Sequence, residues 1–419
     1  MSAGESGADQ SARNTRVFLS MVAAWFIPHG LQIVLYPWLL AVYLQLPPEQ
    51  VGFGQMLLQL PGLFLVLWAG SIADRIDTRK LLGRLHLAAS VPPLLLALLI
   101  WNGQFSFLLL ALFGLSMGVC ISFSNPSRDA MLAVVAKDNI QRVVVSATGV
   151  QFGVQIIGYG IAMLAGVTGP ALLLLVQGVM ISSGYFIARQ LPARPQQQPS
   201  TDAGNHPPEK GAVRQGLKVV WDTPEIFSVL LVSLAGSVLY LGSFFVLIPL
   251  LIRDYYGGGA AQIGLVNICF MAGTLLMVWV LLRRRGIRRQ GRAYMLANVW
   301  GAALSLTVIS TGVSFPVLML VLGTWGAAAG IGMSMSRTIL QQYAPESHRA
   351  RVFAAYQLCF MAGGPIGSLM MGYLIGQFGP LQAAMAPPIG MVFIMTSVYL
   401  FTDLWRIEAP SAVREKAAG

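Results

Sequence analysis

The sequence predicts an all-α integral membrane protein with twelve transmembrane helices, arranged as two pseudo-symmetric six-helix bundles. Composition, recurrent long apolar segments and one-sided charge lead to this fold class. Hydrophobic residues make up 56% of the 419 residues and charged residues 10%, whereas about a quarter of the residues in a soluble globular domain are charged. The mean hydropathy of +0.68 leaves too little polar sequence to cover a water-facing surface.

Twelve apolar segments are long enough to cross roughly 30 Å of hydrocarbon as helices. Continuous apolarity without strict alternation favours helices over a β-barrel. In chain order, the predicted spans are residues 17–44, 51–73, 81–101, 105–124, 143–167, 170–191, 226–252, 261–282, 293–313, 315–335, 352–375 and 380–401. They divide the chain into an N-terminal tail (1–16), a first bundle (17–191), a linker (192–225), a second bundle (226–402) and a C-terminal tail (403–419).

The net charge of +11 reflects membrane topology rather than a nucleic-acid partner. With the N-terminus in the cytoplasm, all 27 Lys and Arg residues except Arg253 fall on the cytoplasmic side, as the positive-inside rule requires. We therefore expect a multi-pass protein of the inner (plasma) membrane with both termini cytoplasmic. Cys120, Cys269 and Cys359 lie within predicted spans, so neither a disulfide framework nor a metal site is expected.

The linker changes character along its length. Its first part is rich in Pro, Gln and Ser and is typical of a disordered segment. Towards its end, Val213, Leu217, Val220 and Trp221 recur at helical spacing. This pattern predicts a short amphipathic helix on the inner leaflet, with a plain polar loop as the alternative.

The two halves of the chain align with a shift of 209 residues. The matched positions are Ser127–Arg128 with Ser336–Arg337, Arg142 with Arg351, Gly114 with Gly323, and Gly158 with Gly367. A series of matches in one register predicts an internal duplication. Two six-helix repeats around a cavity near the membrane midplane are an architecture of secondary transporters.

The stretch "GSIADRIDTRK", between the second and third spans, places five charges within residues 74–80. Its residues Gly70, Asp74, Arg75, Arg79 and Lys80 resemble the signature loop of the major facilitator superfamily. The resemblance extends over residues 17–402 and implies two bundles that rock about a central site. It also implies that this loop is a cytoplasmic latch that holds the outward-open state.

The resemblance further implies partners for the latch. Asp74 would face the N-terminus of the eleventh span, where free amides favour an anion. Arg75 or Arg79 would pair with Asp129, which follows Arg128 at the end of the fourth span. Gly70 would allow a close helix approach. Asp77 and Thr78 depart from the family, which usually has Gly and a basic residue there; a solvated, lipid-anchoring loop is the alternative.

Polar residues at helical spacing predict the substrate pathway. An amide that faces lipid is costly, so such residues are expected to face the bundle interior; helix–helix hydrogen bonding is the alternative. The predicted pathway residues are Trp25, His29, Gln32 and Tyr36 in span one, Gln55 and Gln59 in span two, Gln151, Gln155 and Tyr159 in span five, and Ser237 and Tyr240 in span seven.

No Asp or Glu lies in the middle of a predicted span, and His29 is the one titratable group expected at membrane depth. His29 is therefore the candidate for proton coupling, with a hydrogen-bonding role as the alternative. The sequence has no phosphate-binding P-loop and no nucleophile–base set. We expect a monomer that is not an enzyme and uses no cofactor, and whose partners are a small-molecule substrate, the lipid bilayer and coupling protons.

A second resemblance concerns the direction of transport and the class of substrate. The stretches "NPSRDAMLAVV" and "LQQYAPESHRARVFAAYQL" are similar to the enterobactin-exporter, or transmembrane secretion effector, branch of the superfamily. This resemblance implies efflux of a siderophore-like metabolite or a drug. Uptake or flipping of a nutrient or lipid-like substrate by the same fold is the alternative, and a non-transporting receptor on this scaffold is a more distant one.

Overall fold

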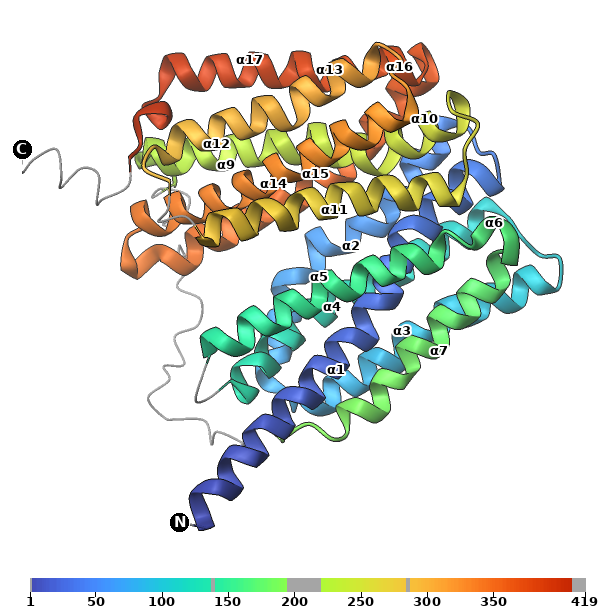
Figure 1. Cartoon of the computed structure of the whole chain (residues 1–419), viewed down its shortest axis with the longest axis vertical. Coiled ribbons are helices and arrows are strands. Elements are labelled where there is room, and N and C mark those ends of the chain that lie inside the picture. Colours follow the sequence, from blue (N-terminus) through green and yellow to red (C-terminus); the bar gives the residue numbers. More distant parts are fainter. Residues whose placement is uncertain (1, 137–139, 194–219, 284–286, 409–419) are drawn as a thin grey trace, which may run out of the picture. The chain divides into compact units, whose positions relative to one another are not determined.

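The computed structural model describes the chain apart from residues 1, 137–139, 194–219, 284–286 and 409–419, and apart from some side chains within helices (Figure 1). Every regular element in the described ranges is a helix. The chain divides into two compact units. Unit 1 comprises residues 1–46, 54–200 and 258–265, and unit 2 comprises residues 47–53, 201–257 and 266–419.

The first half of the chain contributes the main helices of unit 1. They are α1 (Ser2–Trp38), continued by a π-helical turn (Leu39–Tyr43), α2 (Pro48–Arg75), α3 (Thr78–Trp101), α4 (Phe107–Val135), α5 (Ile140–Ala162), the short α6 (Ala165–Thr168) and α7 (Pro170–Ala188).

The second half contributes the helices of unit 2. Span seven is α9 (Pro224–Gly236), two π-helical turns (Ser237–Leu241 and Ser243–Leu247) and α10 (Ile248–Asp254). The remaining helices are α11 (Ala260–Arg283), α12 (Gln290–Asn298) with a π-helical turn (Val299–Leu304) and α13 (Ser305–Ser310), α14 (Phe315–Tyr343), a 3₁₀ turn (Glu346–His348), α15 (Arg349–Phe378), α16 (Pro380–Ala383), α17 (Ala386–Phe401) and a 3₁₀ turn (Leu404–Arg406).

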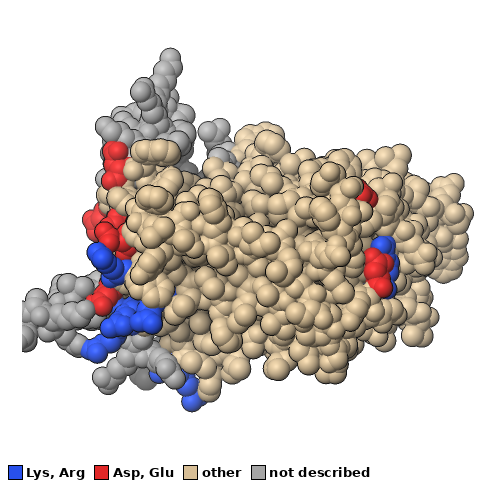
Figure 2. Space-filling model, turned by 90° about the horizontal axis from the view of Figure 1, so that it is seen from above, with Lys and Arg blue, Asp and Glu red and all other residues tan. Residues whose placement is uncertain are grey.

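Eleven helices of the described chain are long and apolar enough to cross a membrane, which makes this a multi-pass membrane protein. Each coincides with a predicted span. The remaining predicted span, residues 51–73, lies on α2, a 28-residue helix several of whose side chains fall outside the described set. Charged side chains on the face in Figure 2 gather at its two ends, and the band between is uncharged, as hydrocarbon contact requires.

The same helix pairings occur in both units. In unit 1, α1 packs along α5 and α3 packs along α7. In unit 2, span seven packs along α15, and the span formed by α12 and α13 packs along α17. Spans one and five thus correspond to seven and eleven, and spans three and six correspond to nine and twelve. This correspondence is what an internal duplication produces.

Both predicted tails contain more structure than expected. The helix α1 begins at Ser2, so the predicted N-terminal tail is helical. In the predicted C-terminal tail, Leu404 and Ile407 are buried in the core of unit 2, and the amide of Gly291 donates to the Ile407 carbonyl at 3.1 Å. The predicted amphipathic helix lies outside the described residues except Val220 and Trp221, which are helical.

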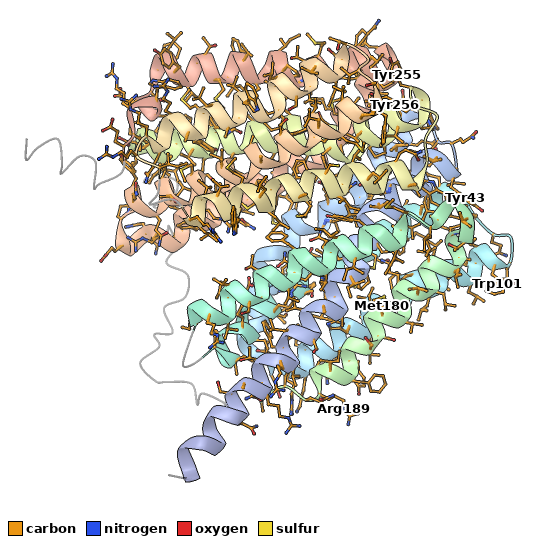
Figure 3. All side chains as sticks on the ribbon, in the orientation of Figure 1. Tyr43, Trp101, Met180, Arg189, Tyr255 and Tyr256 are labelled. Carbon is orange, nitrogen blue, oxygen red and sulfur yellow. The ribbon has the colours of Figure 1, made fainter. Side chains whose placement is uncertain are left out.

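Aromatic residues mark the helix ends. Figure 3 shows Tyr43 and Trp101 at one end of unit 1 and Arg189 at the opposite end. Tyr43 and Trp101 are exposed, as Tyr and Trp are at membrane–water interfaces. Arg189 is also exposed, and it lies at the end of α7 that is away from Trp101, because α7 runs antiparallel to α3. An exposed Arg at a helix end is consistent with a second membrane–water interface there.

Candidate functional site

The four predicted pathway residues of span one lie in two kinds of environment. Gln32 and Tyr36 hold helices together: the Gln177 amide of α7 donates to Gln32 Oε1 at 3.1 Å. The Tyr36 hydroxyl lies 3.0 Å from the carbonyl of Gly54 and 3.3 Å from that of Leu110. These contacts tie α1 to α2, α4 and α7.

Trp25 and His29 lie nearer the first turns of the span. Trp25 is buried and stacks edge-on against His86 of α3, with ring centroids 5.3 Å apart. His29 is half-buried and stacks edge-on against Phe26 at 5.9 Å. His29 is therefore the more accessible of the two histidines.

His86 corrects the prediction that His29 is the one titratable group at membrane depth, and Arg128 is a charged residue that α4 carries beyond the predicted span 105–124. Both lie inside helices long enough to span the membrane, α3 and α4. Both are buried, and the His86 Nδ1 atom lies 2.9 Å from the Ile181 carbonyl of α7. His86 falls within the predicted span 81–101, so a search for any titratable residue inside a predicted span would have found it.

Two of the four predicted amides of spans two and five form hydrogen bonds within their own helices. Gln55 is buried, and Gln59 Nε2 donates to the Gln55 carbonyl at 3.2 Å. Gln155 Nε2 donates to the Tyr159 hydroxyl at 2.9 Å. Gln151 is half-buried. Of these four amides, Gln59 and Gln151 keep the most exposed surface.

Unit 2 contains an aromatic cluster that sequence analysis found only in part. Tyr240 lies 6.1 Å from Trp325, and Phe244 lies 4.7 Å from Phe270, between ring centroids. Trp325 also stacks edge-on against Phe244 and Phe270 at 6.1 Å. The Tyr240 hydroxyl donates to the Asn298 carbonyl at 2.8 Å. These four residues, Tyr240, Phe244, Phe270 and Trp325, are the unit 2 aromatic cluster.

The aromatic cluster lies where span seven departs from α-helical geometry. Its residues Tyr240 and Phe244 lie in the two π-helical turns, and such turns are frequent at functional sites. Ser237, at the start of the first turn, donates to the Phe360 carbonyl of α15. Phe270 and Trp325 come from α11 and α14, and no local sequence pattern links them to span seven.

The predicted latch is described only in part. The side chains of Asp74 and Arg75 lie outside the described residues. Arg79 is half-buried, while Lys80 and Asp129 are exposed. A Cβ at Gly70 would meet no described atom within 4 Å, so the close helix approach predicted there is absent from the described chain.

Asp77, one of the two departures from the family loop, has a structural role at the start of α3. Its side chain accepts a hydrogen bond from the Arg79 amide at 3.0 Å and so caps the N-terminus of α3. Thr78, the other departure, is fully buried. A DTRK sequence at a predicted helix start was a sufficient signal for this cap.

A cavity of about 530 Å³ lies in unit 2 beside the C-terminal segment that contains Leu404 and Ile407. Its charged lining residues are Glu225, Arg289, Arg292, Asp403, Arg406 and Glu408. Arg292 stacks on Trp405 at 5.1 Å, and Arg289 lies 3.9 Å from Glu408. Because the positive and negative groups are equal in number, this cavity has no net preference for a charged ligand.

Comparison with known proteins places the chain in a family of transporters. The family model of the Major Facilitator Superfamily matches residues 17–368. A multidrug efflux pump, Tap of Mycolicibacterium fortuitum, is 26% identical over 189 residues, which are 44% of this chain and 45% of that protein. The chain thus matches less than half the length of this relative.

Solved structures share the fold. The nucleoside transporter NupG aligns with a TM-score of 0.72 at 12% identity, over 94% of this chain and 100% of that chain. A bacterial homologue of the human lysosomal transporter Spinster aligns with a TM-score of 0.65 at 13% identity, over 96% and 99% of the two chains. With eleven described helices long and apolar enough to cross a membrane, a duplicated packing pattern and a family match over most of its length, the chain belongs to the major facilitator superfamily.

Proposed function

We propose that this protein is a secondary active transporter that exports a siderophore-like metabolite or a drug by alternating access. The observation that supports export rather than uptake is the similarity to a multidrug efflux pump. The resemblance of "NPSRDAMLAVV" to secretion carriers supports the same direction independently of that similarity.

The residues of the two units support an organic cargo rather than a small ion. In unit 1, Gln59 and Gln151 offer amides with exposed surface. In unit 2, the aromatic cluster offers flat apolar faces without a charged member. Aromatic faces with a few hydrogen-bonding groups are the usual lining of an organic ligand site.

The proposal includes the topology and the gate. Both termini lie in the cytoplasm, the protein lies in the inner membrane, and Asp74 acts in the cytoplasmic latch. Within this scheme His29 is the proton-coupling residue, since it keeps more exposed surface than His86 does. The protein works as a monomer, because each repeat supplies one half of the transport path.

The test is an untargeted mass-spectrometric comparison of spent medium. Four strains are compared: wild type, a deletion, and the deletion complemented with Asp74→Asn or with Asp77→Asn. The two variants remove one negative charge from the same loop, but Asn at position 77 still caps α3. We expect a metabolite that is missing from the medium of the deletion and Asp74→Asn strains and is restored by Asp77→Asn.

Other outcomes would change the proposal in defined ways. Full export by Asp74→Asn would remove the latch. If the medium is unchanged while a solute disappears from the cells of the deletion strain, uptake replaces export. Accumulation in everted membrane vesicles checks the direction separately, because an exporter fills such vesicles from outside.

A further inference from the structure

Arg128 is a buried cation that the transport scheme leaves unexplained. It lies seven residues before the end of α4 (Phe107–Val135), which is about 10 Å along the helix. The side chain is 8% exposed. A guanidinium does not lose its proton in proteins, and a charge buried away from water is costly unless it is paired.

The side chains that the described structure places in direct contact with the Arg128 guanidinium are neutral. Its guanidinium lies over the ring of Phe26 at 4.4 Å and that of Trp25 at 5.4 Å. It donates to Asn125 Oδ1 and, at 3.5 Å, to Ser124 Oγ. Among the described residues no carboxylate forms an ion pair with it. Cation–π contacts and neutral acceptors only partly compensate a buried charge.

The neighbouring carboxylate, Asp129, acts on this charge electrostatically but forms no ion pair with Arg128 among the described residues. Asp129 follows Arg128 directly, but successive residues on a helix do not face each other. In agreement, Asp129 is exposed whereas Arg128 is buried. Burial of Arg128 therefore creates a positive site inside unit 1 rather than a buried ion pair with Asp129.

The guanidinium also keeps hydrogen-bonding capacity. It carries five N–H donors in a planar fork that suits a bidentate oxyanion. Asn125 and Ser124 are the only described acceptors. A further polar atom nearby lacks a described partner: Nε2 of His86, whose ring contacts Trp25, is buried without a hydrogen bond.

The wall of this site is aromatic and held in place. Trp25 packs edge-on against His86, with an interplanar angle of 81°. His86 is in turn held by the Ile181 carbonyl of α7. Aromatic rings beside a cation with five donors suit an oxyanion attached to a flat apolar body.

The internal duplication does not account for this burial. Arg337 is the residue matched to Arg128 by the 209-residue shift, and it follows a serine in both halves. Arg337 is nevertheless exposed. Only unit 1 therefore has a buried arginine at this position, and Arg337 provides a matched control.

We propose that Arg128 binds an oxyanion of the transported molecule, so that the substrate is an organic anion with a carboxylate or similar group on a flat apolar body. This inference rests on the proposed transport function. In that scheme Arg128 lies about two turns from the cytoplasmic end of α4, where a substrate bound for export first enters.

The test is binding of two probes that differ only in charge. The full chain is purified in phosphatidylcholine nanodiscs and titrated with 2-naphthoate and with its neutral analogue 2-naphthamide. We expect wild type to prefer the naphthoate. Arg128→Gln weakens naphthoate binding about 10- to 100-fold, the usual effect of losing a charge-assisted hydrogen bond, and leaves naphthamide binding unchanged.

Two further variants complete the design. Arg128→Lys keeps the charge without the planar fork and is expected to bind naphthoate with intermediate affinity. Arg337→Gln removes the matched exposed arginine and is expected to bind both probes as wild type does. If Arg128→Gln fails to fold, the preference of wild type and its reduction in Arg128→Lys decide the question.

Equal binding of the two probes by wild type, or unchanged naphthoate binding by a folded Arg128→Gln, would overturn the inference. A merely structural role for Arg128 would weaken both probes alike. Selective naphthoate binding without any naphthoate flux into everted vesicles would instead count against the proposed transport and leave the anion site standing. The two failures are thus distinguishable.

Discussion

Gly158 of α5 lies directly against the backbone carbonyl of Ile27 in α1, and a Cβ at position 158 would overlap that oxygen. Its repeat partner, Gly367 of α15, lies in the same way against the carbonyl of Val238 in span seven. The duplication therefore preserves a backbone-to-backbone contact in each unit. Small residues permit such close helix packing in membranes.

Gly158→Ala is expected to destabilise unit 1, because the added methyl group meets backbone that cannot rotate away. Overpacking of this kind costs about 1–3 kcal/mol, which corresponds to a fall in Tm of about 2–10 °C. The measurement is thermal unfolding of the purified protein in detergent. Gly153→Ala is the control on the same helix, since its Cβ would meet no described atom within 4 Å.

Tyr36→Phe is expected to lower stability by about 1 kcal/mol, the net value of a typical hydrogen bond, and to leave substrate affinity unchanged. The reason is that the Tyr36 hydroxyl contacts only helix carbonyls, those of Gly54 and Leu110, among the described residues. Thermal unfolding and transport KM measure the two effects. A changed KM at unchanged stability would return Tyr36 to the substrate pathway.

Asp77→Ala is expected to destabilise the start of α3 by about 0.5–2 kcal/mol, the usual cost of losing an N-cap. The Asp77 carboxylate accepts the Arg79 amide hydrogen bond that this variant removes. Hydrogen exchange at the first turn of α3 reports the change locally. Asp77→Asn should exchange as wild type does, and equal fraying in both variants would mean that charge rather than capping is responsible.

His29→Gln is expected to preserve substrate exchange across the membrane but to abolish accumulation driven by a pH gradient. Glutamine keeps a hydrogen-bonding group and cannot carry a proton at physiological pH. Counterflow and pH-jump uptake in proteoliposomes separate the two activities. An unchanged response to the pH gradient would rule out His29 as the coupling residue, and the same assay on His86→Gln would then test the buried histidine of α3.

Sequence patterns were most informative about membrane spans, because the length of an apolar segment alone decides whether it can cross the hydrocarbon. The segment 315–335 is predicted to span because its apolar run matches the hydrocarbon thickness, and α14 (Phe315–Tyr343) covers it. Patterns were less informative for side-chain partners. Trp25 and Tyr36 share one predicted helical face, yet Trp25 contacts His86 and Tyr36 bonds to backbone carbonyls.

The sequence by itself determined that the chain crosses the membrane repeatedly, that its halves are duplicated and that its Asp and Glu residues avoid the middle of the predicted spans. Each of these follows from composition and spacing along one segment. Only the tertiary structure decided that Arg128 is buried against Phe26 while Arg337, in a matching Ser-Arg pair, is exposed. Burial depends on which helices pack around a residue. The neighbouring helices, α1 for Arg128 and α1 and α7 for His86, are distant in the chain, so no local sequence pattern reveals them.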